Sequence, residues 1–138
     1  LSVKEIISRI EELVPKVKIF ACMDNLEYVV LGGRLSKTAG AVGSALNLKP
    51  YFTVKDGEIH VVKKSRGLKH AISDIGCELL RHPVDYTKPT IGMYAYKVDN
   101  LEMFLSSVDF KVDDIKIIGS TIATYVGPGG FGVGYFEM

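Results

Sequence analysis

The chain has 138 residues, of which 47% are hydrophobic and 24% are charged. This composition predicts one compact soluble domain that covers residues 1–138, and it excludes an intrinsically disordered chain. The 17 Lys and Arg residues and the 16 Asp and Glu residues leave a formal net charge of +1. This balance argues against nucleic acid or an anionic membrane as a charge-driven partner.

The two cysteines predict a reducing environment. Cys22 and Cys77 each lie in an apolar stretch, and the sequence has no CxxC pair or Cys/His cluster. We therefore expect two buried thiols, no disulfide, no metal and no other cofactor, in a cytoplasmic protein. The chain begins at Leu1 and shows no signal-peptide pattern. We expect a segment upstream of it to be missing.

The longest charge-free run, residues 117–136, is as long as a membrane span. It contains Pro128 and six glycines, a composition that suits two strands and a glycine loop better than a helix in lipid. The sequence therefore predicts no membrane span.

The first predicted element is an amphipathic helix. Ser2 and Glu5 form a capping-box pattern, and apolar residues recur at helical spacing until Pro15. We expect this helix to bury one face. The continuous apolar run 17–23 predicts a strand after it.

Two short helices are predicted around a double glycine. Asp24 and Glu27 repeat the cap pattern ahead of a helix that ends at Gly32 and Gly33. A further helix over 36–46 consists mainly of small residues. It needs close packing, because glycine in a helix interior costs about 1 kcal/mol relative to alanine.

A hairpin is predicted where Asp56 and Gly57 separate the strands 51–54 and 59–63. The remaining predicted elements are a helix over 68–80, a strand over 91–98, a helix over 99–106 capped by Asp99 and Glu102, and strands over 115–118, 121–126 and 131–136. This order predicts an α+β fold, with a mixed, largely antiparallel sheet of about six strands and helices packed on it.

Catalytic patterns are weak. His60, His70 and His82 lack partners at metal-ligand spacing, and we expect all three to be exposed. The adjacent Asp113 and Asp114 are more typical of a turn than of an acid–base pair. Because the sequence pairs no nucleophile with a base, we predict that the protein is not an enzyme.

Two segments suit a polar ligand. After the double glycine, Arg34 and Ser36 precede the small-residue helix, and together with free backbone N–H groups they can converge on a carboxylate or phosphate. The alternative is a helix terminator, a surface arginine and an N-cap serine.

In the second segment, Thr124 and Tyr125 precede the glycine loop 127–130, where a ligand can approach the backbone closely. The alternative here is a simple strand-to-strand turn. Together, the two segments predict a polar head-group site beside apolar walls.

Several segments, in this order, resemble the DegV family. They are DNLEY at 24–28, GGRLSK at 32–37, GSALNLKP at 43–50, DGE at 56–58, KSRG at 64–67, residues 118–124, and GPG at 127–129. The resemblance implies a two-lobed bacterial protein that binds a long-chain fatty acid. Several members of the family present the carboxylate to a separate fatty acid kinase. They are carriers and not catalysts.

The resemblance places the chain in the C-terminal lobe of such a protein, without the N-terminal lobe. An apolar docking surface left by that lobe predicts self-association. The resemblance implies that Arg34 is the head-group arginine, and with the two segments above the predicted ligand-binding residues are Arg34, Ser36, Thr124, Tyr125, Gly127 and Gly129. Arg66 is implied as the surface residue that faces the kinase.

For the acyl chain, one face of the small-residue helix offers a lining of Ala39, Val42, Gly43 and Leu46. Ordinary packing of this face on the sheet is an equal alternative. The family usually has a histidine where Tyr125 stands. A tyrosine donates a hydrogen bond but carries no positive charge, so contact with an acyl phosphate weakens while a carboxylate can still be held. A second hypothesis is therefore a protein-interaction domain with a degenerate acyl site.

Overall fold

The computed structural model describes residues 1–33 and 47–138. Their strands form one sheet in the order β3-β2-β1-β6-β4-β5. The strands are β1 (Val17–Cys22), β2 (Leu48–Lys55), β3 (Glu58–Arg66), β4 (Ile91–Tyr94), β5 (Asp114–Ile117) and β6 (Phe131–Phe136). Only the β4–β5 pair is parallel within this sheet. The predicted α+β fold with a mixed, largely antiparallel sheet is confirmed.

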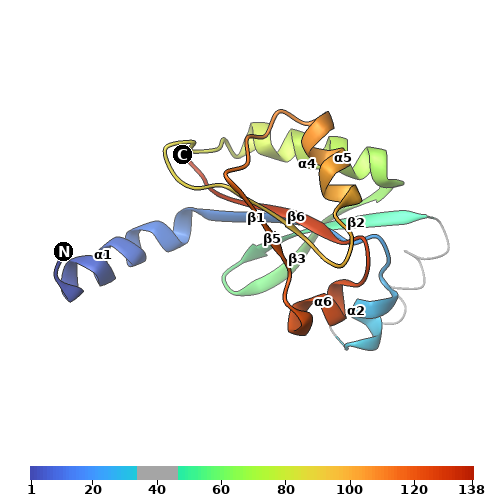
Figure 1. Ribbon diagram of the computed structural model, residues 1–138, viewed down its shortest axis with the longest axis horizontal. Helices are drawn as coiled ribbons and strands as arrows, with labels where there is room; N and C mark the ends of the chain where they lie inside the picture. Colours follow the sequence, from blue (N-terminus) through green and yellow to red (C-terminus); the bar gives the residue numbers. More distant parts are fainter. Residues whose placement is uncertain (34–46) are drawn as a thin grey trace.

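Helices lie on both faces of the sheet (Figure 1). On one face are α4 (Leu68–Arg81) and α5 (Asp99–Ser107), and on the other are α2 (Glu27–Leu31) and α6 (Ser120–Val126). The N-terminal helix α1 (Val3–Leu13) extends away from the sheet and joins β1 through a turn of 3-10 helix at Val14–Lys16.

The main core lies between the sheet and the layer formed by α4 and α5. Phe20 and Val133 are register partners in β1 and β6, and both point into this core. Ile75 of α4 and Phe104 of α5 meet them from the helices. Because side chains alternate along a strand, the intervening residues point to the opposite face.

The β2–β3 hairpin confirms its prediction. Asp56 and Gly57 have φ angles of 52° and 76°, the left-handed conformation that a two-residue turn requires at both positions. The ladder continues from the Lys55–Glu58 pair to the Leu48–Arg66 pair, with a register shift between Tyr51 and Phe52.

The prediction of a strand over 121–126 is wrong, because these residues form the helix α6. The segment is rich in β-branched residues, which favour a strand locally. Tertiary packing overrides that preference: Ala123 is buried, and Val126 packs against the cluster of Met23, Leu26, Val29 and Phe52. Gly127, with φ of 75°, ends the helix. The charge-free run is therefore a strand end, a helix, a loop and a strand.

The first helix has the predicted capping box but not the predicted buried face. Ser2 Oγ accepts from the Glu5 amide at 3.3 Å, and Glu5 accepts from the Ser2 amide at 2.5 Å. None of the residues of α1 is buried. Its apolar face is exposed because α1 points away from the sheet (Figure 1).

Two predicted caps are also wrong. At α2, Asn25 Oδ1 accepts from the Glu27 amide at 2.8 Å, while Asp24 forms an ion pair with Lys49. At α5, the N-cap residue is Val98, and no side chain caps the helix. The preceding strand β4 ends at Tyr94 and not at the predicted residue 98.

The cysteines and histidines differ in their surroundings. Cys22 is buried, and burial raises the pKa of its thiol to about 12. Cys77 is exposed, which contradicts the prediction of two buried thiols, because it lies on the outer side of α4. His60 and His70 are exposed as predicted, but His82 is half-buried.

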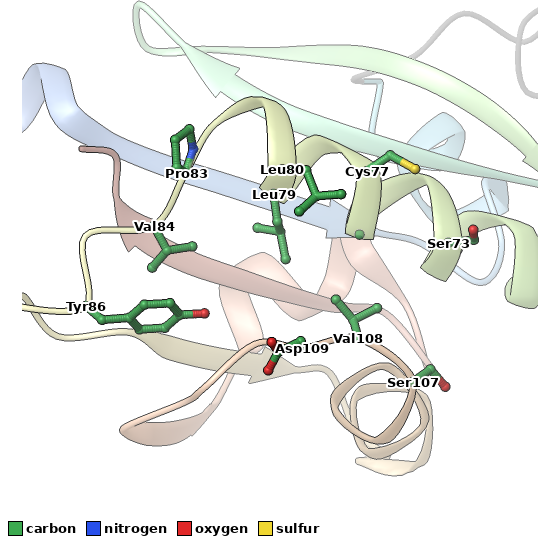
Figure 2. Close-up of a pocket in the computed structure, with 11 residues that line it drawn as sticks. Ser73, Cys77, Leu79, Leu80, Pro83, Val84, Tyr86, Ser107, Val108 and Asp109 are labelled. Carbon is green, nitrogen blue, oxygen red and sulfur yellow. The ribbon is translucent and has the colours of Figure 1, made fainter.

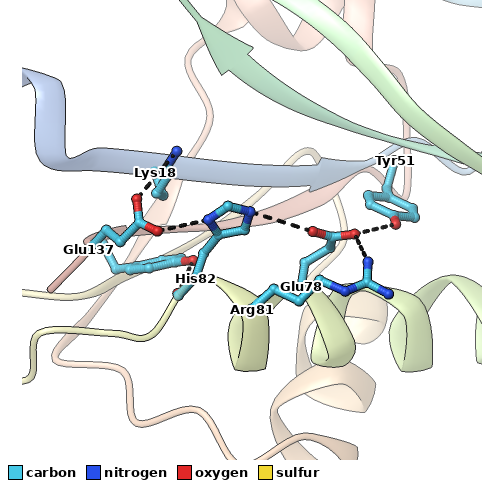
Figure 3. A network of polar contacts seen from close by, with 7 residues as sticks. Lys18, Tyr51, Glu78, Arg81, His82 and Glu137 are labelled. Carbon is cyan, nitrogen blue, oxygen red and sulfur yellow. Dashed lines mark hydrogen bonds and ion pairs between the residues drawn. The ribbon is translucent and has the colours of Figure 1, made fainter.

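A polar network holds the end of α4 to the sheet (Figure 3). Glu78 is buried, and it accepts from the Tyr51 hydroxyl at 3.2 Å and from Arg81 at 2.9 Å. His82 lies between two carboxylates, with Nδ1 at 2.7 Å from Glu137 Oε1 and Nε2 at 3.9 Å from Glu78 Oε2. The network explains why His82 is half-buried and not fully exposed.

Glu137 gives this network a pH dependence. Partial burial raises the pKa of its carboxyl, but hydrogen bonds from His82 and Lys18 outweigh burial and leave the pKa below the ordinary value of 4.5. A lowered pKa stabilises the fold above the ordinary value, and the stabilisation is lost as the pH falls through the folded value.

We therefore expect wild type to be more stable than Glu137→Gln near neutral pH, and this difference to shrink as the pH falls from about 5.5 to about 3. Thermal unfolding across this range measures it. Glu11→Gln is the control, because Glu11 is exposed on α1. A difference between wild type and Glu137→Gln that stays constant with pH contradicts the assignment.

Candidate functional site

Part of the predicted site lies outside the described residues. Six of the residues named from the sequence belong to that part: Arg34, Ser36, Ala39, Val42, Gly43 and Leu46. The roles assigned to them stay predictions. The described part of the site comprises the turn at Gly32 and Gly33, the end of α6 and the glycine loop after it.

The structure brings these two segments together although they are far apart in the sequence. The helices α2 and α6 contact each other beneath the sheet (Figure 1). Their apolar residues join in one small cluster with Phe52 of β2. The ends of both helices therefore form one region at the edge of this face.

Two tyrosine rings fix the contact between α2 and α6. The ring of Tyr125 lies against Gly32, where an added Cβ would overlap Cδ1 and Cε1 of the ring. The ring of Tyr28 lies against Gly127, where an added Cβ would come within 2.9 Å of its Cγ. Each helix thus ends on a glycine that makes room for a tyrosine of the other.

Thr124 is exposed on α6. Its hydroxyl donates to the Ser120 carbonyl at 2.7 Å, so the proton is used within the helix. The oxygen retains the ability to accept. Thr124 and Tyr125 are successive residues in the last turn of a helix, and the loop beyond them joins a helix to a strand. The strand-to-strand alternative is therefore wrong.

Hydrogen bonds to other parts of the chain hold the glycine loop in place. The amide of Gly127 donates to Ala123 at 2.8 Å, and that of Gly129 donates to Ala95 at 3.3 Å. Asn100 Nδ2 donates to the Gly129 carbonyl at 2.8 Å. These bonds engage backbone groups of the loop, so its contribution to a ligand site lies chiefly in its shape.

An apolar surface continues from this region along the sheet. We call it the open face and define it by Val17 and Ile19 of β1, Val54 of β2 and Ile59 of β3. Val17, Val54 and Ile59 are 40%, 41% and 60% exposed. A hollow of about 550 Å³ lies beside the hairpin turn, lined by Val17, Ile19 and Val54 and also by the charged Lys18, Lys55 and Asp56.

The sequence contained a signal for the residues of the open face that our prediction did not use. Val54 and Ile59 are cross-strand partners, and Val17 and Ile19 alternate along β1. Side chains at alternate positions share one face of a sheet. We expected an apolar docking surface but assigned no residues to it, because burial depends on which elements lie over a face.

The sequence of the chain matches the model of a known protein family. The family described as "Uncharacterised protein, DegV family" matches residues 1–138. The chain belongs to the DegV family. The predicted recognition is thereby confirmed.

Curated relatives of this DegV chain are about twice as long. A DegV domain-containing protein of Caldanaerobacter subterraneus is 33% identical over 99% of this chain and 50% of its own length. One of Clostridium perfringens is 34% identical over 93% of this chain and 46% of its own length. The chain thus spans about half the length of these relatives.

Solved structures share the fold. A DegV protein of Eubacterium eligens has a TM-score of 0.84 at 16% identity, and the fatty acid kinase B3 protein of Streptococcus pneumoniae has 0.82 at 23%. Both matches cover all of this chain, and 51% and 50% of the respective structures. The first is described as loaded with heptadecanoic acid and the second with linoleic acid.

Arg66 lies at the end of β3 and is exposed. The adjacent Ser65 is buried and donates to Asp74 Oδ2 at 2.5 Å, while Lys63 forms an ion pair with Oδ1 at 2.9 Å. Burial raises the pKa of Asp74, but these two partners outweigh it and the pKa is lowered. Asp74 of α4 thereby fixes the strand end from which Arg66 projects.

A second hollow lies on the opposite side of the molecule, between α4 and the end of α5 (Figure 2). It encloses about 500 Å³, and its lining includes Leu79, Val84, Tyr86 and Val108. The exposed Cys77 is at its rim. Of the residues predicted for the ligand, the described ones, Thr124, Tyr125, Gly127 and Gly129, do not line it.

The described residues include no group of three or more His, Cys, Asp or Glu side chains that could hold a metal ion. In the same part of the chain, no helix is both long enough and apolar enough to cross a membrane.

The contact between Tyr125 and Gly32 predicts a specific clash. Gly32 has φ of −76°, a conformation open to any residue, so among the described residues it is the ring of Tyr125 that excludes a side chain there. We expect Gly32→Ala to destabilise the fold by about 1–3 kcal/mol, because the ring and the turn must move apart.

Chemical denaturation measures this cost. In a Tyr125→Ala background we expect Gly32→Ala to cost less, since the ring is gone. Gly119→Ala is the control, because nothing lies within 4 Å of an added Cβ at Gly119. We expect that control to change stability by less than about 1 kcal/mol. An equal cost of Gly32→Ala in both backgrounds overturns the prediction.

Proposed function

We propose that this DegV chain binds a long-chain fatty acid, with the carboxylate beside the ends of α2 and α6 and the acyl chain along the open face. The observation that carries the proposal is the exposed apolar surface formed by Val17, Val54 and Ile59, on the face of the sheet where α2 and α6 also lie. An apolar wall that ends at a few polar groups is the usual design of a site for an amphipathic ligand.

The related structures support this proposal. The proteins of Eubacterium eligens and Streptococcus pneumoniae are described with fatty acids bound, and both share the fold of this chain over its whole length. A protein of Thermotoga maritima with a TM-score of 0.78 is likewise described by a fatty acid binding function. Fold alone does not fix function, and the open face supplies the independent argument.

In the proposed site, Arg34 and Ser36 hold the carboxylate together with Thr124 and Tyr125. Gly127 and Gly129 shape the loop beside them. A guanidinium is suited to a carboxylate because it offers paired N–H donors. Tyr125 adds a neutral donor, so the site favours a free carboxylate over a doubly charged head group.

The acyl chain needs cover on its other side. Ala39, Val42, Gly43 and Leu46 are the proposed lining within this chain. We propose further that the chain is one lobe of a two-lobed protein and that the other lobe closes over the open face. The relatives' double length and the exposure of Val17, Val54 and Ile59 support this arrangement.

The role we propose is that of a carrier and not of a catalyst. One of its structural relatives is described as a fatty acid kinase B3 protein. We therefore propose that a separate kinase receives the bound carboxylate and that Arg66 contacts it. The exposed position of Arg66 at a fixed strand end supports a contact with a partner.

A protein-interaction domain without lipid is the second candidate. The neutral Tyr125 favours it, because this side chain cannot offer the positive charge that a histidine can. This candidate predicts partner binding that depends on Arg66 in a chain that never carries fatty acid.

The first test is mass spectrometry of an organic extract of the purified chain, followed by titration with oleic acid. We expect a stoichiometric fatty acid. Val54→Glu should weaken binding at least about tenfold, since a carboxylate on the open face must be desolvated against the acyl chain. The matched control is Met103→Glu on α5, at a residue that is 40% exposed.

Equal effects of Val54→Glu and Met103→Glu would remove the open face from the site. Absence of fatty acid from the extract, and no binding by the chain joined to the other half of a relative, would exclude the carrier role. It would leave the interaction domain.

A second test addresses Arg66. We expect Arg66→Glu to keep oleic acid affinity within about twofold and to weaken association with a bacterial fatty acid kinase at least about tenfold, because it reverses a charge at the contact. Lys111→Glu, which reverses an exposed charge elsewhere, is the control. Unchanged kinase association of Arg66→Glu would refute the contact.

A further inference from the structure

The contact between α2 and α6 is reciprocal. Tyr28 lies in the first turn of α2 and rests on Gly127, which ends α6. Tyr125 lies in the last turn of α6 and rests on Gly32, which ends α2. The two rings and the two glycines therefore connect the two halves of the proposed head-group site.

Both glycines are required, for different reasons. At Gly32 the backbone is helical, and within the described part of the chain the ring of Tyr125 is what excludes a side chain. At Gly127 the φ of 75° already disfavours other residues, and the ring of Tyr28 fills the remaining space. Each ring thus sits directly on the backbone of the other helix.

Such short helices depend on contacts of this kind. The helix α2 has five residues and α6 has seven, and isolated helices of this length are unstable in water. Their ends are consequently placed by tertiary packing. The buried cluster that includes Leu26 and Val29 anchors α2 to the sheet, and Val126 at the end of α6 packs against it.

Tyr28 is not simply a core residue. It is 39% exposed, whereas Leu26 and Val29 in the same segment are 2% and 5% exposed. A half-exposed ring contributes less to stability than a buried one. Its distinctive contact is the one with Gly127, one residue after the last turn of α6.

We propose that Tyr28 is a positioning residue of the head-group site. By lying on Gly127, its ring sets the place of the glycine loop and of Thr124 and Tyr125 relative to the turn at Gly32. This inference rests on the proposed function for its ligand, but the packing itself can be tested without a ligand.

The ligand-free test is nuclear magnetic resonance of the isotope-labelled chain. An aromatic ring held over a glycine shifts the α-proton signals of that glycine upfield. We expect this shift at Gly127 in wild type and in Tyr28→Phe, and its loss in Tyr28→Leu. Persistence of the shift in Tyr28→Leu would show that another group causes it and would overturn the proposal.

The functional test compares oleic acid with methyl oleate, which has the same chain but no carboxylate. Tyr28→Leu should weaken the affinity for oleic acid at least about tenfold, because it displaces a charge-assisted contact with the carboxylate. The affinity for methyl oleate should stay within about twofold of the wild-type value. Tyr28→Phe should restore the wild-type preference for the acid, because the ring is sufficient. The matched control is Tyr86→Leu, at a half-exposed tyrosine beside the other hollow.

The outcomes are distinct. An equal loss of acid and ester in Tyr28→Leu would reduce Tyr28 to a structural role and overturn the proposal. If wild type binds neither probe, alone or joined to the other half of a relative, the proposed function fails. The signals of Gly127 then report only a packing contact, and the positioning role is overturned with it.

Discussion

The pairing of β1 with β6 at the centre of the sheet is the contact on which the other features depend. It places Phe20 and Val133 side by side toward α4 and α5, and it sends Gly132 to the opposite face. An added Cβ at Gly132 would lie 2.9 Å from the Phe20 carbonyl oxygen. The close approach of these two strands therefore requires a residue without a side chain, and the whole sheet is built outward from them.

The two faces of this sheet have different partners. One face is covered by two longer helices, and its residues form the main core. Among the described residues, the other face carries α2 and α6 at one end (Figure 1), and Val17, Val54 and Ile59 are exposed beyond them. Exposed apolar side chains of this extent are costly for an isolated protein and typically mark a binding surface. That asymmetry, more than any single residue, is the basis of the lipid ligand that we propose.

The small unit of α2, α6 and the glycine loop carries the specificity that we propose. Its helices are too short to be stable alone, and the rings of Tyr28 and Tyr125 define how they meet. The loop is tied to Ala95 and Asn100 by backbone and side-chain hydrogen bonds. A rigid unit of this kind can present a few polar groups to a ligand at little entropic cost.

The sequence by itself determined the features that depend on neighbouring residues. Turn chemistry at Asp56 and Gly57, the capping box of α1 and the helical spacing of α4 are local, and each was predictable. The family was also recognisable, because its short motifs occur in order. For the site, the sequence indicated residues such as Thr124 and Tyr125, but it did not show that they lie at the end of a helix packed against α2.

Tertiary structure decided the features that depend on what lies across the sheet. Residues 121–126 have the composition of a strand, yet packing against α2 makes them a helix. The apolar faces of α1 and of the sheet could not be assigned as buried from periodicity, since periodicity shows that a face is apolar and not what covers it. For the same reason only the structure could show Tyr28 and Gly127 in contact: their meeting is a product of two distant segments.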